Sequence, residues 1–211
     1  MMHIYACFVT LCCVVCVCSG QQKCCINDDL FTITFERLTG WYSESFNLTF
    51  EETSFMVNDY THGRFYVNRI RNSLNTELEK TLVIEDYNRS FIWTIDAVAK
   101  TCKMALLPRG AEKPTRCVPG NAQYLDEINL PGDVPVNRWS YILKTPTEIS
   151  EVTRGYTKTG CIPTGGTVVA REDQGGIDVE ILALHTFYNF EVLTDVSKYF
   201  SLPSYCNSTY N

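Results

Sequence analysis

The sequence predicts an all-β domain, either a sandwich or an open barrel, and three observations support this prediction. Apolar and polar residues alternate over many short segments, as they do in strands with one buried face. These segments recur roughly every ten residues between turn-forming positions, a spacing typical of antiparallel β folds. No internal repeat, heptad pattern or convincing amphipathic helix interrupts them.

The first predicted strands follow directly from this alternation. Phe31–Phe35 places apolar residues at every second position, and Phe65–Ile70 and Thr81–Ile84 are rich in β-branched and aromatic residues. A short polar break at Glu85–Ser90 separates the last of these from Phe91–Ile95. The pattern therefore predicts a hairpin at this point.

The remaining strands lie on either side of a polar loop. A turn at Asp96–Lys100 precedes an extended segment, and a loop rich in Pro, Lys and Arg then runs from Pro108 to about Gly120. Gly175-Gly176 marks the turn before a long aromatic segment, and short turns are expected around Asp195–Phe200. The predicted strands are Cys102–Leu107, Trp139–Leu143, Ile149–Tyr156, Thr167–Arg171 and Val179–Phe190.

The amino-terminal residues 1–20 are predicted to be a signal peptide. They carry no charged side chain, and the apolar run Ile4–Cys18 is shorter than the ~20 residues that a membrane-spanning helix needs. Small residues at Cys18, Ser19 and Gly20 offer a cleavage site. A membrane anchor is the alternative, which the length disfavours. Residues 21–211 are expected to form a single secreted, extracellular domain.

Cysteine usage agrees with export. Cleavage after residue 20 would leave six of the eleven cysteines, and an even number in a secreted chain predicts three disulfides. The neighbours Cys24 and Cys25 are poorly placed to bond each other, so each should reach a distant partner. The six are Cys24, Cys25, Cys102, Cys117, Cys161 and Cys206.

The net charge of the chain disfavours some classes of binding partner. The net charge of −6 disfavours nucleic acid and anionic membrane surfaces, since both require clustered Lys and Arg. Arg64, Arg69 and Arg71 are isolated in the sequence and are predicted to lie on a solvated strand face. Acceptor sequons for N-glycosylation occur at Asn47, Asn88 and Asn207, all expected on the surface.

Several short motifs in this chain together resemble the ependymins and ependymin-related proteins. The strand and turn Phe91–Asp96 and the following Lys100–Met104, with its cysteine and nearby methionine, are similar to one segment of that family. The order and spacing of the motifs extend the resemblance from Cys24 to Cys206. The further matching segments are Asn58–Val67, Val136–Trp139, Cys161–Pro163 and Leu202–Cys206.

The resemblance implies a fold and a set of properties. It implies two curved antiparallel sheets, resembling bacterial lipoprotein carriers, with an apolar pocket between them. It also implies a secreted, glycosylated homodimer with calcium binding and a role in cell–matrix adhesion. Cys102 would pair with Cys206, Cys161 with either Cys24 or Cys25, and Cys117 with the remaining member.

Catalytic and metal sites are weakly supported. Only His62 and His185 follow the signal peptide, and no nucleophile elbow, metal-binding histidine pair or P-loop is present, so the chain is expected to be non-enzymatic. Calcium needs six to eight oxygen ligands, which separate loops can supply; its ligands here are unknown. Solvated loops are the alternative for the oxygen-rich clusters Asn27–Asp29, Asp126-Glu127 with Asp133, and Glu172-Asp173 with Asp178.

An apolar ligand, such as a lipid, is the predicted partner. The residues expected to line its pocket are Phe65, Val67, Trp93, Ile95, Met104, Leu106, Leu184 and Phe187. Aromatic residues also fill ordinary cores, and periodicity cannot distinguish a filled interior from a hollow one. The predicted function is therefore carriage of an apolar ligand with calcium-dependent contact to extracellular matrix. The rival is a purely structural adhesion glycoprotein with a filled core.

Overall fold

The computed structural model describes residues 21–73, 76–108, 110–111, 113–145 and 147–206. The predicted signal peptide and the Asn207 sequon lie outside the described residues. Within them, no helix is long and apolar enough to cross a bilayer. The regular elements are β1 Leu30–Tyr42, β2 Asn47–Asp59, β3 Arg64–Ser73, β4 Thr76–Asp86, β5 Phe91–Asp96, β6 Thr101–Leu106, β7 Gln123–Leu130, β8 Val134–Lys144, β9 Glu148–Thr157, β10 Pro163–Asp173, β11 Asp178–Val192 and the 3₁₀ helix η1 Ser197–Tyr199.

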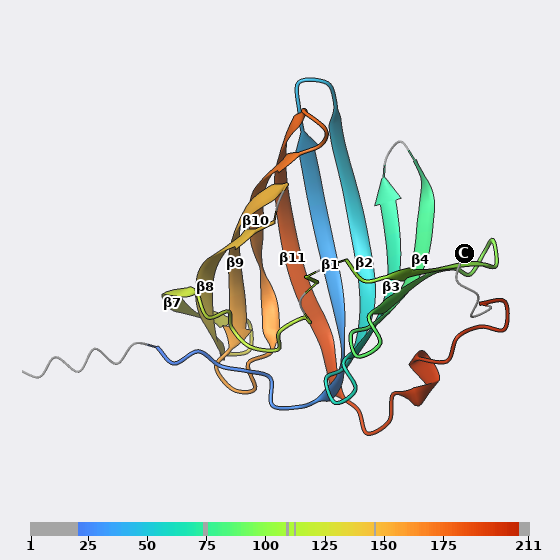
Figure 1. The fold of residues 1–211 in the computed structure, drawn as a ribbon. Helices are drawn as coiled ribbons and strands as arrows, with labels where there is room; N and C mark the ends of the chain where they lie inside the picture. Colours follow the sequence, from blue (N-terminus) through green and yellow to red (C-terminus); the bar gives the residue numbers. More distant parts are fainter. Residues whose placement is uncertain (1–20, 74–75, 109, 112, 146, 207–211) are drawn as a thin grey trace, which may run out of the picture.

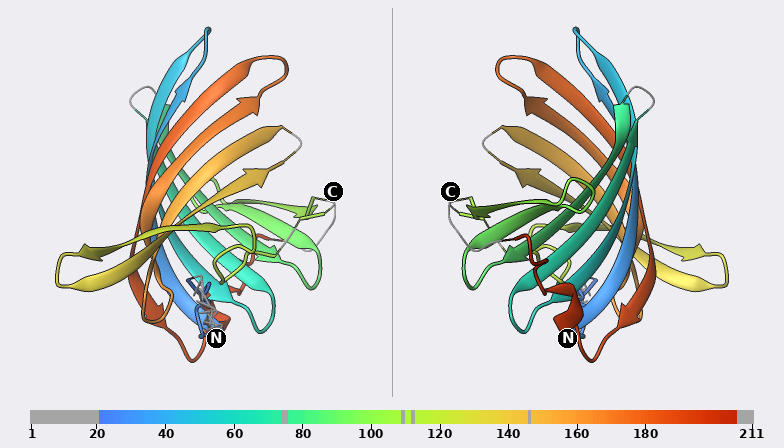
Figure 2. Two further views of the ribbon diagram at one scale, coloured as in Figure 1. Left: turned by 90° about the vertical axis from the view of Figure 1, so that its left-hand side faces the viewer. Right: turned by 90° about the vertical axis from the view of Figure 1, so that its right-hand side faces the viewer.

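All eleven strands form one antiparallel sheet in the order β6-β5-β4-β3-β2-β1-β11-β10-β9-β8-β7. The first and last strands of the chain therefore pair at its centre. The sheet curls into an open half-barrel whose edges are β6 and β7 (Figures 1 and 2). This confirms the predicted all-β open half-barrel. The two expected sheets are joined in one ladder, because β1 pairs with both β2 and β11.

Every predicted strand overlaps an observed one, but the pattern does not reveal β2 and β7. In β2 the run Glu51–Ser54 is polar, although Glu52 and Ser54 are buried. In β7, an edge strand, most residues are exposed, so little burial shapes its sequence. The sequence pattern did not predict these two strands, because hydrophobic alternation arises only where one face of a strand packs against apolar groups.

Strand alternation gives the sheet two different faces. The concave face carries Phe31 and Ile33 of β1, and the amino-terminal segment 21–29 and the described residues of the β6–β7 loop (107–108, 110–111 and 113–122) pack across it. The convex face of β2 and β3 is covered by the carboxy-terminal segment 193–206, whose Tyr199 contacts the rings of Phe55 and Tyr66. Figure 2 shows this segment outside the curl of the sheet.

Two apolar clusters form the core of the concave face. The larger joins Trp139 and Tyr141 of β8 to Val118 and Ala122 of the β6–β7 loop. The smaller joins Ile26 of the amino-terminal segment to Phe31 and Ile33, with Met56 and Phe187 partly buried against them. Both clusters therefore depend on chain segments that lack regular structure but lie across the hollow of the sheet.

Three disulfides hold these covering segments in place. Cys24 bonds Cys161 and Cys25 bonds Cys117, which ties the amino-terminal segment to both the β9–β10 turn and the β6–β7 loop. Cys102 bonds Cys206, which fastens the carboxy-terminal segment to β6. These are the pairings that the ependymin resemblance implies, with Cys24 rather than Cys25 bonded to Cys161.

Candidate functional site

The hollow of the half-barrel contains a small apolar pocket of about 190 Å³, here called the concave pocket. Its floor is made by side chains of β1, β2 and β11 that point to the concave face. Its roof is made by the amino-terminal segment and the β6–β7 loop. It is lined by Ile26, Phe31, Ile33, Met56, Asn58, Tyr60, Pro114, Thr115, Arg116, Arg154, Tyr156, Pro163 and Phe187.

Aromatic rings pack against one another around the floor of this pocket. The ring of Phe31 lies 5.2 Å from that of Phe190 and 5.9 Å from that of Tyr60, and Phe35 lies 5.0 Å from Phe187. Burial raises the pKa of Tyr60 to about 12, against a smaller opposing effect of Arg116. The phenol is therefore neutral at physiological pH and contributes to an apolar lining.

Polar contacts, as well as disulfides, hold the two roof segments together and attach them to the pocket lining. Lys113 donates a hydrogen bond from Nζ to the carbonyl oxygen of Tyr60 at 2.8 Å. Arg116 forms an ion pair with Asp29, and its guanidinium lies 5.8 Å from the ring centroid of Tyr60. The pocket is thus closed by segments far apart in sequence that are linked at several points.

Above the apolar pocket, the concave face carries a cluster of arginines around one buried carboxylate. Glu52 of β2 is only 2% exposed and lies 3.1 Å from Arg37, 3.2 Å from Arg71 and 3.4 Å from Arg69. Burial acts to raise the pKa of Glu52, but the three arginines together hold it below its ordinary value. The carboxylate is therefore ionised and paired.

This cluster corrects the expectation for the basic residues. Arg69 and Arg71 are separated in sequence but converge with Arg37 on Glu52, because β1, β2 and β3 pair side by side. Arg64 instead contacts fully buried Asp59 at 2.6 Å. Burial opposes ionisation of Asp59, yet hydrogen bonds from Arg64 and His62 keep its pKa below the ordinary value.

The predicted pocket residues are divided between the two faces. Phe187 lines the concave pocket, and Phe65 and Val67 lie on the same face, paired with pocket residues Asn58 and Met56. The structure therefore does not gather the eight residues in one cavity. The five that belong to the convex face are Trp93, Ile95, Met104, Leu106 and Leu184.

Sequence reasoning missed most of the actual lining. Phe31, Ile33 and Met56 line the pocket from β1 and β2, and Tyr60 lies just beyond β2. The alternation of Phe31–Phe35 identified a buried face, but the cavity depends on which strands neighbour β1. Trp93 shares a face with Ile84 rather than with Val67, because Ile84 pairs with Trp93 while Val67 pairs with Val83.

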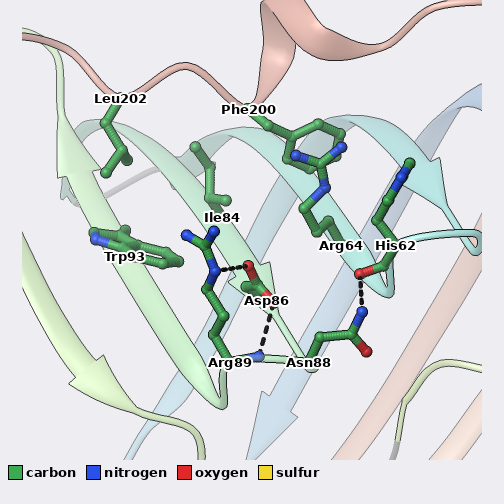
Figure 3. Close-up of a pocket in the computed structure, with 9 residues that line it drawn as sticks. All are labelled: His62, Arg64, Ile84, Asp86, Asn88, Arg89, Trp93, Phe200 and Leu202. Carbon is green, nitrogen blue, oxygen red and sulfur yellow. Dashed lines mark hydrogen bonds and ion pairs between the residues drawn. The ribbon is translucent and has the colours of Figure 1, made fainter.

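A second hollow, the convex pocket of about 360 Å³, lies beneath the carboxy-terminal segment (Figure 3). Trp93, Phe200 and Leu202 give it an apolar part, and the Arg64 guanidinium lies 4.4 Å from the ring centroid of Phe200. Polar groups form the rest of the rim, where Arg89 lies 3.7 Å from Asp86. This mixed lining fits an apolar ligand less well than the concave pocket does.

The sequons and oxygen-rich clusters are placed as follows. Asn47 and Asn88 are both exposed, and Asn88 borders the convex pocket, where its Nδ2 donates to the carbonyl oxygen of His62. Within the described ranges, no group of three or more His, Cys, Asp or Glu side chains is arranged to hold a metal ion. Asp126 instead pairs with Arg138 and Glu127 with Lys158.

The convex face also bears a strip of exposed apolar side chains, here called the convex apolar strip. Its centre is formed by cross-strand neighbours of β1, β10 and β11, since Leu38 pairs with Leu184 and Leu182 with Val169. Each of these four side chains is about half exposed. The strip comprises Leu38, Ile142, Ile149, Val169, Leu182 and Leu184.

Together these features define a class of protein: a disulfide-linked, open β half-barrel with a roofed apolar hollow on its concave face. The family model described as Ependymin matches residues 75–206, and the chain belongs to the ependymin family. Ependymin-related protein 2 of Haliotis asinina is 27% identical over 161 residues, covering 73% of this chain and 77% of that protein. Ependymin-related protein 1 of the same organism is 25% identical, covering 73% and 78%.

Among solved structures, a DUF1329 family protein from Desulfovibrio piger gives a TM-score of 0.24 at 11% identity, covering 83% of this chain and 90% of that chain. MucB in complex with MucA gives a TM-score of 0.14 at 8% identity, covering 74% and 89%. Such scores carry no weight for the fold. The expected likeness to bacterial lipoprotein carriers therefore stays a prediction.

Proposed function

We propose that this ependymin-related chain is a secreted, non-enzymatic glycoprotein that binds an apolar, lipid-like molecule in the concave pocket. The observation that carries the proposal is the pocket itself, with an aromatic and aliphatic floor under a roof tied by two disulfides. Its volume is below the roughly 300–1,000 Å³ of typical ligand sites. It therefore holds one segment of a lipid chain, and the remainder extends along the concave face.

Native mass spectrometry of the secreted, deglycosylated protein, with organic extraction of copurifying molecules, tests this proposal. A stoichiometric lipid that is lost on denaturation supports it. Absence of any copurifying lipid, together with failure to bind fatty acid and phospholipid probes, would leave the rival adhesion protein with a filled core. The same spectrum reports the oxidation state of the six cysteines.

A matched pair of variants locates the site. Phe187→Arg places a charge in the concave pocket, whereas Leu184→Arg places the same charge on the opposite face of the same strand. We expect displacement of an apolar fluorescent probe to be lost in the first variant and retained in the second. Equal probe binding by both variants contradicts a concave site.

The convex apolar strip supports a second proposal, that the protein forms a homodimer through this face. Contiguous exposed apolar side chains on a sheet mark an interaction surface, and a strip on one sheet can pack against its own copy about a twofold axis. The occupant is thus a second copy of the chain. Size-exclusion chromatography with light scattering tests it, and a monomeric wild-type protein contradicts it.

We also propose calcium binding and cell–matrix adhesion, and we assign both to the glycans rather than to a pocket. Among the described residues, no group of three or more His, Cys, Asp or Glu side chains is placed to hold a metal ion, and Asp29 and Asp126 of the predicted clusters pair with Arg116 and Arg138. The glycans at Asn47, Asn88 and Asn207 are therefore the proposed calcium-binding groups. Removing all three sequons should abolish calcium-dependent matrix binding while lipid uptake persists; unchanged matrix binding contradicts this role.

A further inference from the structure

The arginine cluster on the concave face holds more positive charge than Glu52 can balance. Arg37, Arg69 and Arg71 contribute three positive charges and Glu52 one negative, so this cluster carries +2. Glu79, which lies 3.6 Å from Arg71, is 56% exposed and only partly offsets this charge. The whole chain carries −6, so the cluster is a local reversal of sign. A partly enclosed positive site of this kind attracts an anion.

The excess charge continues across the sheet along one row of paired residues. Arg37 pairs with His185, His185 with Gly166, and Gly166 with Arg154. Gly166 carries no side chain, so the side chain of Arg154 can extend across β10 toward β11, where its guanidinium lies 5.2 Å from the ring centroid of Phe187. A Cβ at Gly166 would lie 1.9 Å from the carbonyl oxygen of Thr153, so any larger residue at this position would displace the backbone of β9.

Two polar atoms of this row have no hydrogen-bond partner. Nε of Arg37 and Nε2 of His185 are buried and have no hydrogen-bond partner. Burial, together with the positive charges of Arg154 and then Arg37, lowers the pKa of His185 to about 4. Both arginines therefore lie close enough to act on His185, one on each side of it in the row. Unsatisfied buried donors are costly unless a ligand or water pairs with them.

The charged row reaches the apolar pocket through Arg154. Arg154 lines the concave pocket and its guanidinium lies 5.2 Å from the ring centroid of Phe187, which also lines it. Arg154 is not placed to neutralise Glu52, because it is on β9, four strands along the sheet from β2. Its position instead joins the charged row to the apolar floor.

We propose that Arg154, at the edge of the concave pocket, and Arg37, on the other side of His185 in the same row, bind the anionic head group of an amphiphile whose apolar tail occupies the concave pocket. This inference rests on the proposed lipid-binding function and names its ligand class: a single-chain lipid ending in a carboxylate or a phosphate. Guanidinium groups bind both anions through paired hydrogen bonds. The arginines set the polarity of the ligand, and the aromatic floor accepts its chain.

The test measures affinities of the full disulfide-bonded protein for ligands that share one oleoyl chain. Oleate and oleoyl lysophosphatidate are the anionic ligands, monooleoylglycerol is the neutral one, and inorganic phosphate is titrated alone. Arg154→Gln is the test variant, since Arg154 is far from Glu52 in the sheet. Arg171→Gln is its control, because Arg171 lies on the convex face and is 81% exposed.

We expect the anionic lipids to bind at least about tenfold more tightly than monooleoylglycerol, as charge-assisted hydrogen bonds require. Arg154→Gln should remove most of this preference and leave the affinity for monooleoylglycerol unchanged, and Arg171→Gln should change neither. A difference between oleate and lysophosphatidate supports the site and identifies its anion. Arg154→Lys keeps the positive charge and the aliphatic part of the side chain, so it should retain part of the preference. It replaces Arg154→Gln as the test variant if that variant does not fold.

Other outcomes separate this inference from the function on which it rests. Equal affinity for neutral and anionic lipids, or an unchanged preference in the Arg154 variants, overturns the head-group site but leaves the apolar pocket standing. Failure of every lipid and of phosphate to bind overturns both. Binding of inorganic phosphate that depends on Arg154, without lipid binding, supports the anion site and overturns the apolar-ligand function.

Discussion

Glu52→Gln is the substitution that most directly tests the arginine cluster. The amide keeps the shape of the carboxylate and removes its charge, leaving Arg37, Arg69 and Arg71 without a counter-charge on a nearly buried neighbour. Removing one partner of a fully buried ion pair costs roughly 3–5 kcal/mol. The three arginine side chains are 29%, 36% and 31% exposed, so water screens part of that loss. We therefore expect a loss of about 1–3 kcal/mol.

The assay is equilibrium unfolding in urea at pH 7 with the disulfides intact. Glu79→Gln is the control, since Glu79 lies 3.6 Å from Arg71 but is more than half exposed, and it should change stability by less than about 0.5 kcal/mol. Equal stability of the Glu52→Gln variant and the wild type would falsify the view that this carboxylate stabilises the cluster.

The pH dependence of the free energy of unfolding tests Glu52 independently. The pKa of Glu52 is lower in the folded protein than its ordinary value of 4.5, so its contribution is present above pH 4.5 and is lost as pH falls through the folded pKa. The Glu52→Gln variant should therefore lose less stability than the wild type over this acidic range. The variant should also bind oleate more tightly, because a negative charge that competes with the carboxylate of oleate is gone.

Three further outcomes are expected. His185, with its pKa lowered to about 4, should stay neutral in NMR titrations above pH 5, and its share of stability should fall as pH drops from 6.5 toward 4; titration near 6.5 contradicts its burial beside arginines. Replacing Cys102 and Cys206 together by serine should cost about 2–5 kcal/mol and red-shift the fluorescence of Trp93 as the carboxy-terminal segment detaches, whereas unchanged emission contradicts that cover. Leu184→Asp should convert the proposed dimer to a monomer in light scattering, and a dimer that survives this charge places the interface elsewhere.

The candidate site was only partly predictable from the sequence. Which face of the sheet a side chain occupies depends on how its strand pairs with the neighbouring strands. Phe65 and Val67 lie on the concave face, and Phe187 lines its pocket. Trp93 and Leu184 have equally apolar strand patterns but point to the other side. A shift of one residue in pairing reverses the face of every side chain in a strand, and no single strand records that phase.

Strand β2 shows the same limit for charged residues. Glu52 reads as a surface residue in isolation, and the arginines that pair with it come from β1 and β3, up to 19 residues away. Their burial is acceptable only because all of them meet. The sequence contained both charges but not their adjacency, so it predicted a solvated face where the structure has a half-buried cluster.

The sequence by itself determined the β character of the chain, most of its strands and its ependymin resemblance, because alternation and motif order are local properties. Only the tertiary structure decided that the strands form a single curled sheet with β1 beside β11, which cysteine of the adjacent pair bonds Cys161, and which residues line the hollow. These depend on register and on contacts between distant segments. Such contacts are fixed by the packing of the whole chain, which no local pattern encodes.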